Sequence, residues 1–399
     1  MAGNIIFLFA KTKTFPGRML LFCALSLVVL DSVSARDEPS ECQLHAAGYA
    51  AQFADLIQSE NYSEMPRLLL QWKESCHESE PLFRARALYL IRERKFAEIL
   101  NGQPILDNAI AFEIRHKLMT EAEMQVIDDY FHLYPDYFGF VPMNSDFDRQ
   151  TQQWARRLQS NVASGSLSFL FLQLWQGQTA TFFKTLNAGY FQDTNLAQEY
   201  NEKLQENLSL PEFNLGLSAG IWVPSGDISI IGYHPSIGIN LGAKTQNTYW
   251  DAIFEFRFGN AHQDLEITVR DSLVTTRNYQ GGYLGLEISH IIKRFASASE
   301  ALEIFAGGGY DIIDIVEDEL DPQRQTFGSL ALHVGVGYRL HFSNRTWLSI
   351  KPGYYFLNHK HASGSSLDGN ALSLRLIFGF SENARKSENL KRLGVQQWW

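Results

Sequence analysis

The strongest constraint on the fold is a two-residue alternation of apolar and polar side chains through the C-terminal half of the sequence. The clearest case is Ser329–Phe342, in which the apolar positions are Leu330, Leu332, Val334, Val336, Tyr338, Leu340 and Phe342. A β-strand with this pattern has one apolar face and one polar face. The alternation predicts eight strands, at about 213–224, 235–245, 248–260, 277–291, 300–314, 327–343, 346–358 and 369–380.

The apolar faces of these strands are too large to be enclosed by a small barrel. They carry roughly 35 large side chains, whereas the interior of an eight-stranded barrel holds on the order of a dozen. The apolar residues must therefore point outward, and outside means lipid. The alternative is a secreted, soluble β-sandwich, because two inner faces would bury more apolar bulk than a barrel interior.

The opposite face of the strands combines glycines with charged residues, which suits a narrow polar interior. Five bases and five acids lie on it, namely Lys244, Arg257, Arg339, Lys351, Arg375, Asp251, Glu255, Glu287, Glu303 and Asp311. Paired in a narrow interior, these charges would close the barrel with ion pairs. The alternative is a small gated pore. His333 and His341 share this face, and we expect them to be hydrogen-bonded interior residues.

With these features the segment 213–380 resembles the small eight-stranded outer-membrane barrels of Gram-negative bacteria, the OmpA/OmpX type. Ala371–Phe380, ALSLRLIFGF, is similar to the closing strand of those barrels. Long outer loops, such as Gly259–Gln280, would alternate with short periplasmic turns, such as Ser343–Arg345. An aromatic girdle at the periplasmic rim would consist of Phe213, Trp250, Phe342, Trp347 and Phe380. The resemblance implies a multi-pass protein of the cell outer membrane.

The N-terminal part of the chain has a different organisation. Residues 1–35 have the basic start, short apolar stretch and small residues of an export signal peptide. Residues 36–210 have apolar residues at helical spacing and predict a periplasmic α-helical domain, either a bundle or an irregular solenoid. The first two helices, at about 42–59 and 64–76, would bring Cys42 beside Cys76 in an antiparallel hairpin. A disulfide is expected there in an exported protein.

Composition argues against several functional classes. The formal net charge of −10 becomes −12 when the first 35 residues, with Lys11, Lys13, Arg18 and Asp31, are removed. This acidic balance disfavours nucleic acid as a partner. No sequence motif indicates a catalytic, metal or cofactor site. The alternative is a lipid-modifying enzyme that uses the loop 358–369, which contains His359, His361, Ser363, Ser365, Ser366 and Asp368.

The remaining segment, 381–399, is expected to be a periplasmic tail. It ends in Trp398 and Trp399, which could contact a partner or the membrane interface or belong to a disordered end. Because an even number of strands places both ends of a barrel on one side, the helical domain and the tail would share the periplasm. The sequence favours an outer-membrane-anchored scaffold or accessory subunit of an envelope machine. Its partners would be outer-membrane lipid and a periplasmic or outer-membrane protein.

Overall fold

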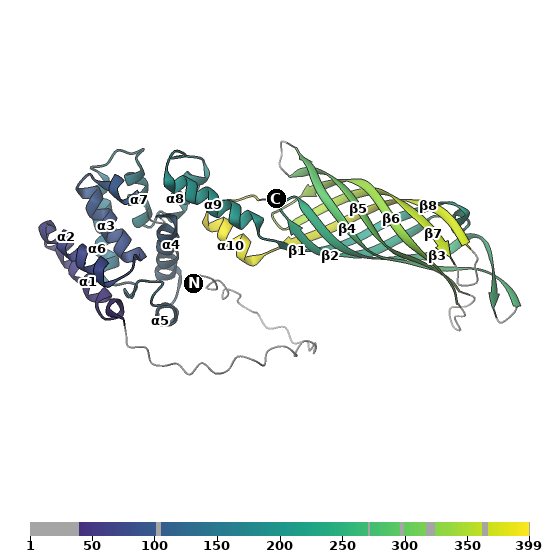
Figure 1. Ribbon diagram of the computed structural model, residues 1–399, viewed down its shortest axis with the longest axis horizontal. Helices are drawn as coiled ribbons and strands as arrows, with labels where there is room; N and C mark the ends of the chain where they lie inside the picture. The colour runs from purple at the N-terminus through teal and green to yellow at the C-terminus, as the bar shows by residue number, and fades with distance from the viewer. Residues whose placement is uncertain are drawn as a thin grey trace. The chain divides into compact units, whose positions relative to one another are not determined.

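The computed structural model describes residues 40–100, 105–269, 272–295, 299–316, 324–360 and 366–398. Helices occupy most of the described residues between Glu41 and Ser209, and a closed eight-stranded antiparallel β-barrel follows (Figure 1). The chain forms two compact units, one extending to Leu204 and including Arg392–Val395, the other beginning at Gln205 and containing the barrel. The predicted fold class is confirmed.

In the described ranges, nine α-helices and two 3-10 helices precede the barrel. They are α1 Glu41–Gln58, η1 Tyr62–Glu64, α2 Met65–Ser75, α3 Glu80–Arg92, η2 Phe96–Leu100, α4 Ile105–Glu121, α5 Met124–Leu133, α6 Asp146–Gln159, α7 Leu167–Trp175, α8 Thr179–Asn187 and α9 Asn195–Ser209. Local signals explain several helix starts. Ser40 caps α1 by accepting a hydrogen bond from the backbone N–H of Gln43, and Pro81 lies in the first turn of α3, where its missing N–H costs nothing.

The helical unit is a bundle in which α6 packs against helices distant in sequence. Phe53 of α1 contacts both Phe147 and Trp154 of α6, with ring centroids 6.1 and 5.9 Å apart. Trp72 of α2 contacts the same Phe147 edge-on at 5.8 Å. In a solenoid each repeat would contact only its neighbours, so these contacts favour the bundle over the solenoid. Along the described residues, no helix is long and apolar enough to cross a membrane.

A disulfide joins Cys42 in α1 to Cys76, the residue that caps the end of α2. Their Cα atoms are 4.7 Å apart, and the bond spans a sequence separation of 34 residues. The observed helices α1 and α2 match the predicted hairpin closely, which is why the two cysteines meet.

The barrel consists of eight strands that pair in sequence order, and β1 pairs with β8 to close the sheet. The strands are β1 Glu212–Gly226, β2 His234–Thr245, β3 Thr248–Val269, β4 Ser272–Arg294, β5 Glu300–Val316, β6 Arg324–His341, β7 Thr346–Lys360 and β8 Ser366–Glu382. Each strand therefore pairs with a neighbour on both sides, as the spanning part of a strand-built membrane protein requires. The connection between β1 and β2 contains a 3-10 turn, η3 Asp227–Ile231.

Most apolar side chains of β6 point outward and most polar ones point into the barrel, as the sequence predicts. Leu330 is 82% exposed and Leu332 is 64% exposed on the outer surface, whereas Ser329 and His333 are buried in the interior. The same parity holds in β3, where Phe256 is 59% exposed and Glu255 is buried. The barrel therefore has an apolar outer surface and a polar interior, the arrangement of a barrel that contacts lipid.

The predicted long loop at Gly259–Gln280 is wrong. Strands β3 and β4 continue through most of it, with a shift of register between Asn260 and Leu265. The apolar Leu265 and the β-branched Val274 and Thr275 suit strands and explain the extension. The prediction failed because the polar residues in this segment interrupt the alternation and resemble a loop.

Candidate functional site in the barrel interior

All ten charged residues assigned to the interior from the sequence lie on the inward face of the strands. None is more than 4% exposed. The strand period explains the placement, because each charge shares the parity of its inward-facing neighbours. Buried charges are costly unless they are paired, so the contacts of these residues decide what the interior can do.

Glu287 of β4 is the centre of the largest cluster. Its carboxylate accepts a hydrogen bond from Lys351 Nζ at 2.8 Å and pairs with Arg375 of β8. His333 Nε2 lies 2.9 Å from the same carboxylate, and the other ring nitrogen contacts the Tyr283 hydroxyl at 3.1 Å. Four strands, β4, β6, β7 and β8, are thus joined across the interior through one acid and its partners.

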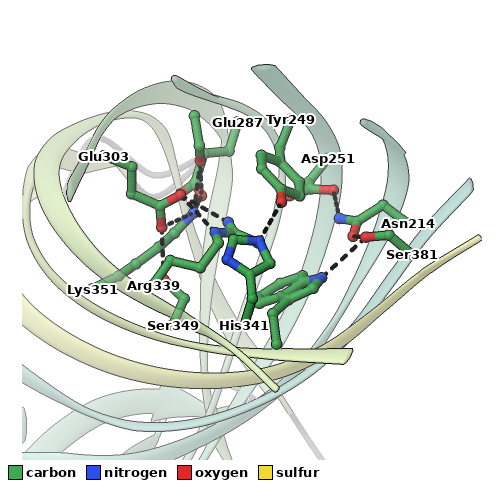
Figure 2. Close-up of polar contacts among 12 residues, drawn as sticks. Asn214, Tyr249, Asp251, Glu287, Glu303, Arg339, His341, Ser349, Lys351 and Ser381 are labelled. Carbon is green, nitrogen blue, oxygen red and sulfur yellow. Dashed lines mark hydrogen bonds and ion pairs between the residues drawn. The ribbon is translucent and has the colours of Figure 1, made fainter. Parts of the chain in front are cut away.

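Glu303 of β5 forms a second cluster beside the first. Arg339 Nη2 lies 2.8 Å from its carboxylate, the Ser349 hydroxyl donates to it at 2.6 Å, and Lys351 lies 3.6 Å away. Figure 2 shows Glu303, Arg339 and Lys351 pointing toward one another. Because Lys351 contacts both Glu303 and Glu287, the two clusters form one network.

Arg339 also lies over two aromatic rings, at 3.7 Å from the Tyr249 centroid and 3.8 Å from the Trp347 centroid. Trp347 is only 2% exposed, and its Nε1 donates to Ser381 Oγ at 3.0 Å. The prediction that Trp347 belongs to an aromatic girdle at the periplasmic rim is therefore wrong. Its parity with Ser349 and Lys351 places it inward, and the missing side chain of Gly379 makes room for the indole.

A third cluster surrounds Asp311 of β5. Arg257 pairs with its carboxylate and with Glu255, and Arg257 lies 4.4 Å from the Trp222 ring centroid. His359 Nε2 contacts Asp311 Oδ1 at 2.8 Å. His359 was predicted in an outer loop, but it lies in β7 and its ring is fully buried. Inward parity would have identified it.

The end of the barrel at which β1 begins and β8 ends has its own polar cluster. Glu212 pairs with Lys244 at 3.2 Å and with Lys386 at 2.9 Å. Asn214 donates to Asp251 at 2.6 Å and accepts from Ser381 at 2.9 Å (Figure 2). With Glu212 and Lys386 added to the ten predicted charges, these buried acids and bases are equal in number. Sequence reasoning missed both residues.

Lys386 belongs to α10, Ala384–Arg392, which follows the last strand. Its Nζ also donates to the carbonyls of Leu208 and Leu210 at 2.8 and 3.2 Å, so it caps the end of α9. Burial lowers the pKa of Lys386, against the opposing effect of Glu212.

The residues that follow α10 contact the β6–β7 turn. Asn344 of this turn donates to the Gln396 carbonyl and accepts from the Trp398 backbone N–H. Trp399 lies outside the described residues.

The opposite end of the barrel is filled by apolar side chains. Ile228 and Ile231 of η3 are fully buried there, so the β1–β2 connection folds into the interior. They pack with Trp222, Ile253, Ala261, Leu265, Tyr279, Tyr283, Ile313, Ile315, Phe327, Ala331, Tyr355, Leu357 and Ala371. The interior thus contains an apolar plug followed by layers of ion pairs.

The ion pairs of this interior connect the strands of the barrel to one another. Within the described ranges, no group of three or more His, Cys, Asp or Glu side chains is arranged to hold a metal ion. Of the loop considered for lipid chemistry, His359 is held by Asp311, Ser366 and Asp368 lie in β8, and residues 361–365 are outside the described residues. Asp311 of β5 pairs with Arg257 and contacts His359.

The helical unit contains a second buried charge cluster that sequence reasoning missed. Arg115 of α4 holds Asp148 of α6 through two hydrogen bonds at 2.9 and 2.8 Å, and Arg84 of α3 donates to the same carboxylate at 2.8 Å. Burial alone would raise the pKa of Asp148, but Arg115 and Arg84 lower it to about 2. Glu80 pairs with Arg84 at 2.9 Å, yet burial still raises the pKa of Glu80.

Comparison with solved structures concerns the barrel. Neisserial surface protein A is 10% identical, with a TM-score of 0.33, over 42% of this chain and 96% of that one. The barrel resembles small outer-membrane barrels. The N-terminal β-barrel domain of Pseudomonas aeruginosa OprF is 11% identical, with a TM-score of 0.26, over 43% of this chain and 100% of that one. A major outer membrane protein from Thermus thermophilus is 15% identical, with a TM-score of 0.29, over 43% of this chain and 99% of that one.

No protein-family model matches the sequence, and a search of curated proteins finds no match.

Proposed function

We propose that this protein is an outer-membrane-anchored scaffold or accessory subunit of an envelope machine for secretion, assembly or surface attachment. In this proposal the barrel anchors the chain in lipid, and the helical domain binds a periplasmic partner. The observation that carries the proposal is the filled barrel interior. A barrel closed by an apolar plug and by ion pairs around Glu287 and Glu303 supplies an anchor, which leaves recognition to the helical domain.

The proposal places the helical domain and the C-terminal tail in the periplasm. Eight strands bring both ends of the barrel to the same side of the membrane, and short turns in small outer-membrane barrels face the periplasm. Protease added to intact cells should leave the tail uncut, and should cut it once the outer membrane is permeabilised. Cleavage of the tail in intact cells would reverse the proposed orientation.

Co-purification tests the scaffold role. An affinity tag inserted between Ser164 and Gly165, both exposed, leaves the contacts of Lys386 and Trp398 intact. The full-length protein extracted in mild detergent should carry one defined protein in stoichiometric amount. Recovery of the protein alone, as a folded barrel with only lipid bound, would contradict the scaffold role.

The alternatives have separate tests. Alanine substitution at Ser363, Ser365 and Ser366 should leave the lipid profile of the outer membrane unchanged, and a changed profile would favour the lipid-modifying enzyme. The filled interior weakens the channel alternative, and planar-bilayer conductance tests it.

A further inference from the structure

Helix α5 has an apolar face wider than the bundle uses. At 100° per residue, one half of its circumference is apolar and consists of Leu133, Val126, Tyr130, Ile127, Phe131 and Met124. Tyr134, the residue that ends the helix, lies beside Tyr130, with ring centroids 6.2 Å apart. Of these side chains only Ile127 is fully buried, in a small cluster with Leu118, Phe138 and Met143. Met124 is 63% exposed and Leu133 is 68% exposed.

The aromatic residues of this face are only partly covered. Tyr130, Phe131 and Tyr134 pack against the small cluster from outside and keep part of their surface exposed. A helix with a broad apolar face normally buries it, and aromatic side chains dominate the energetics of protein interfaces. The face of α5 therefore has the composition of a binding surface.

Acidic residues surround this apolar face. Glu121, Glu123, Asp128, Asp129 and Asp136 are exposed, and residues 121–136 contain no lysine or arginine. This charge excludes two occupants. A second copy related by two-fold symmetry would bring two such acidic surfaces together, and an anionic lipid surface would be repelled in the same way.

We propose that α5 and its acidic margin, residues 121–136, form the docking surface for a basic, apolar segment of a partner protein. This inference rests on the proposed scaffold function and names the surface that performs it. Lysine or arginine side chains of the partner would contact the acidic margin, while its apolar side chains would cover Tyr130, Phe131 and Tyr134.

Site-specific photo-crosslinking in cells tests the surface in the full-length protein. Benzoylphenylalanine at Leu133 should give a protein adduct, and the same group at Leu70, which is 56% exposed on α2, should not. The double variant Asp128→Lys/Asp129→Lys should abolish the adduct at 133. The matched control Asp55→Lys/Glu74→Lys reverses two exposed acids on α1 and α2 and should leave the adduct unchanged. An adduct only with lipid, or one that survives the α5 reversal, would overturn the proposal.

A defined probe supplies a second test. A labelled 14-residue peptide, two repeats of Leu-Lys-Lys-Leu-Leu-Lys-Leu, should bind the detergent-solubilised full-length protein at least tenfold more weakly after Asp128→Lys/Asp129→Lys. The same peptide should bind the Asp55→Lys/Glu74→Lys control as it binds the parent. Equal binding to all three proteins would overturn the proposal. Circular dichroism verifies folding, and Asp128→Asn/Asp129→Asn replaces the reversal if folding is lost.

The two proposals fail in different ways. If the tagged parent protein yields no stoichiometric partner, the scaffold function is wrong. If it yields a partner that remains bound at full stoichiometry after Asp128→Lys/Asp129→Lys, the scaffold function stands and the assignment of α5 is wrong.

Discussion

In both units a single buried carboxylate holds several cations. Glu287 holds Lys351, Arg375 and His333, and Asp148 holds Arg115 and Arg84. In each case one carboxylate satisfies several cations. Removing the carboxylate would leave buried positive charges without their partner, which costs more than the pair itself contributes.

The helical unit should lose stability in acid mainly through Asp148. Because its folded pKa, about 2, is below the unfolded value of about 3.9, its contribution is present above pH 4 and disappears between about pH 4 and 2. This shift in the pKa of Asp148 corresponds to about 2 to 3 kcal/mol in the free energy of unfolding. Glu80, whose pKa is raised, has the opposite effect: as the pH falls and Glu80 takes up a proton, the folded helical unit becomes more stable.

Asp148→Asn should therefore lower the free energy of unfolding at pH 7 by about 3 to 5 kcal/mol, which is measured as a lower urea midpoint. The variant should also lose less stability than the parent between pH 4 and 2. The buried Trp72, Trp154 and Trp175 report unfolding of this unit by fluorescence. Asp146→Asn, two residues away at an exposed ion pair, is the matched control and should change the midpoint little. An equally large effect at Asp146 would contradict the role assigned to the buried cluster.

At the scale of elements, the disulfide constrains the hairpin of α1 and α2. A bond that closes a separation of 34 residues stabilises by about 3 to 4 kcal/mol through the chain entropy of the unfolded state. Cys42→Ser/Cys76→Ser should lower the urea midpoint of the helical unit and leave the barrel folded, which is checked by gel electrophoresis of unheated and heated samples. An unaltered midpoint would mean that helix packing alone holds the hairpin.

Helix α10 should depend on Lys386, whose ammonium group contacts Glu212 and the last carbonyls of α9. Lys386→Met removes these contacts and leaves Glu212 with Lys244 alone, so the tail should become several-fold more sensitive to trypsin at Lys391 and Arg392. Arg385→Met, at the exposed neighbouring position, is the control and should not change the rate at those sites. Equal cleavage rates in the two variants would contradict the role of Lys386.

Most of the barrel could be predicted from the sequence because strand parity is a local property. Parity correctly predicts the outward Leu330 and the eight-stranded fold, and it would also have placed Trp347 and His359 inward if it had been applied without exception. The extension of β3 and β4 was missed because its polar residues resemble a loop. The ion pairs of Lys386 and of Arg115 with Asp148 join elements that are far apart in sequence, so no local pattern predicts them.

For the whole molecule, the decisive question is whether the barrel conducts ions. Two barriers lie in series along the interior, the apolar plug with Ile228 and Ile231 and the ion pairs of Glu287 and Glu303. The full-length protein should therefore show no single-channel conductance in planar bilayers. Replacing Asp227–Ile231 by Gly and Ser should remove the part of the plug that η3 contributes and still give no conductance. Arg339→Ala/Arg375→Ala alone should behave the same way. Only the combined variant should conduct. Conductance of the parent protein, with ion selectivity altered by Arg375→Ala, would make the interior a channel and remove the main support for the anchoring role of the barrel.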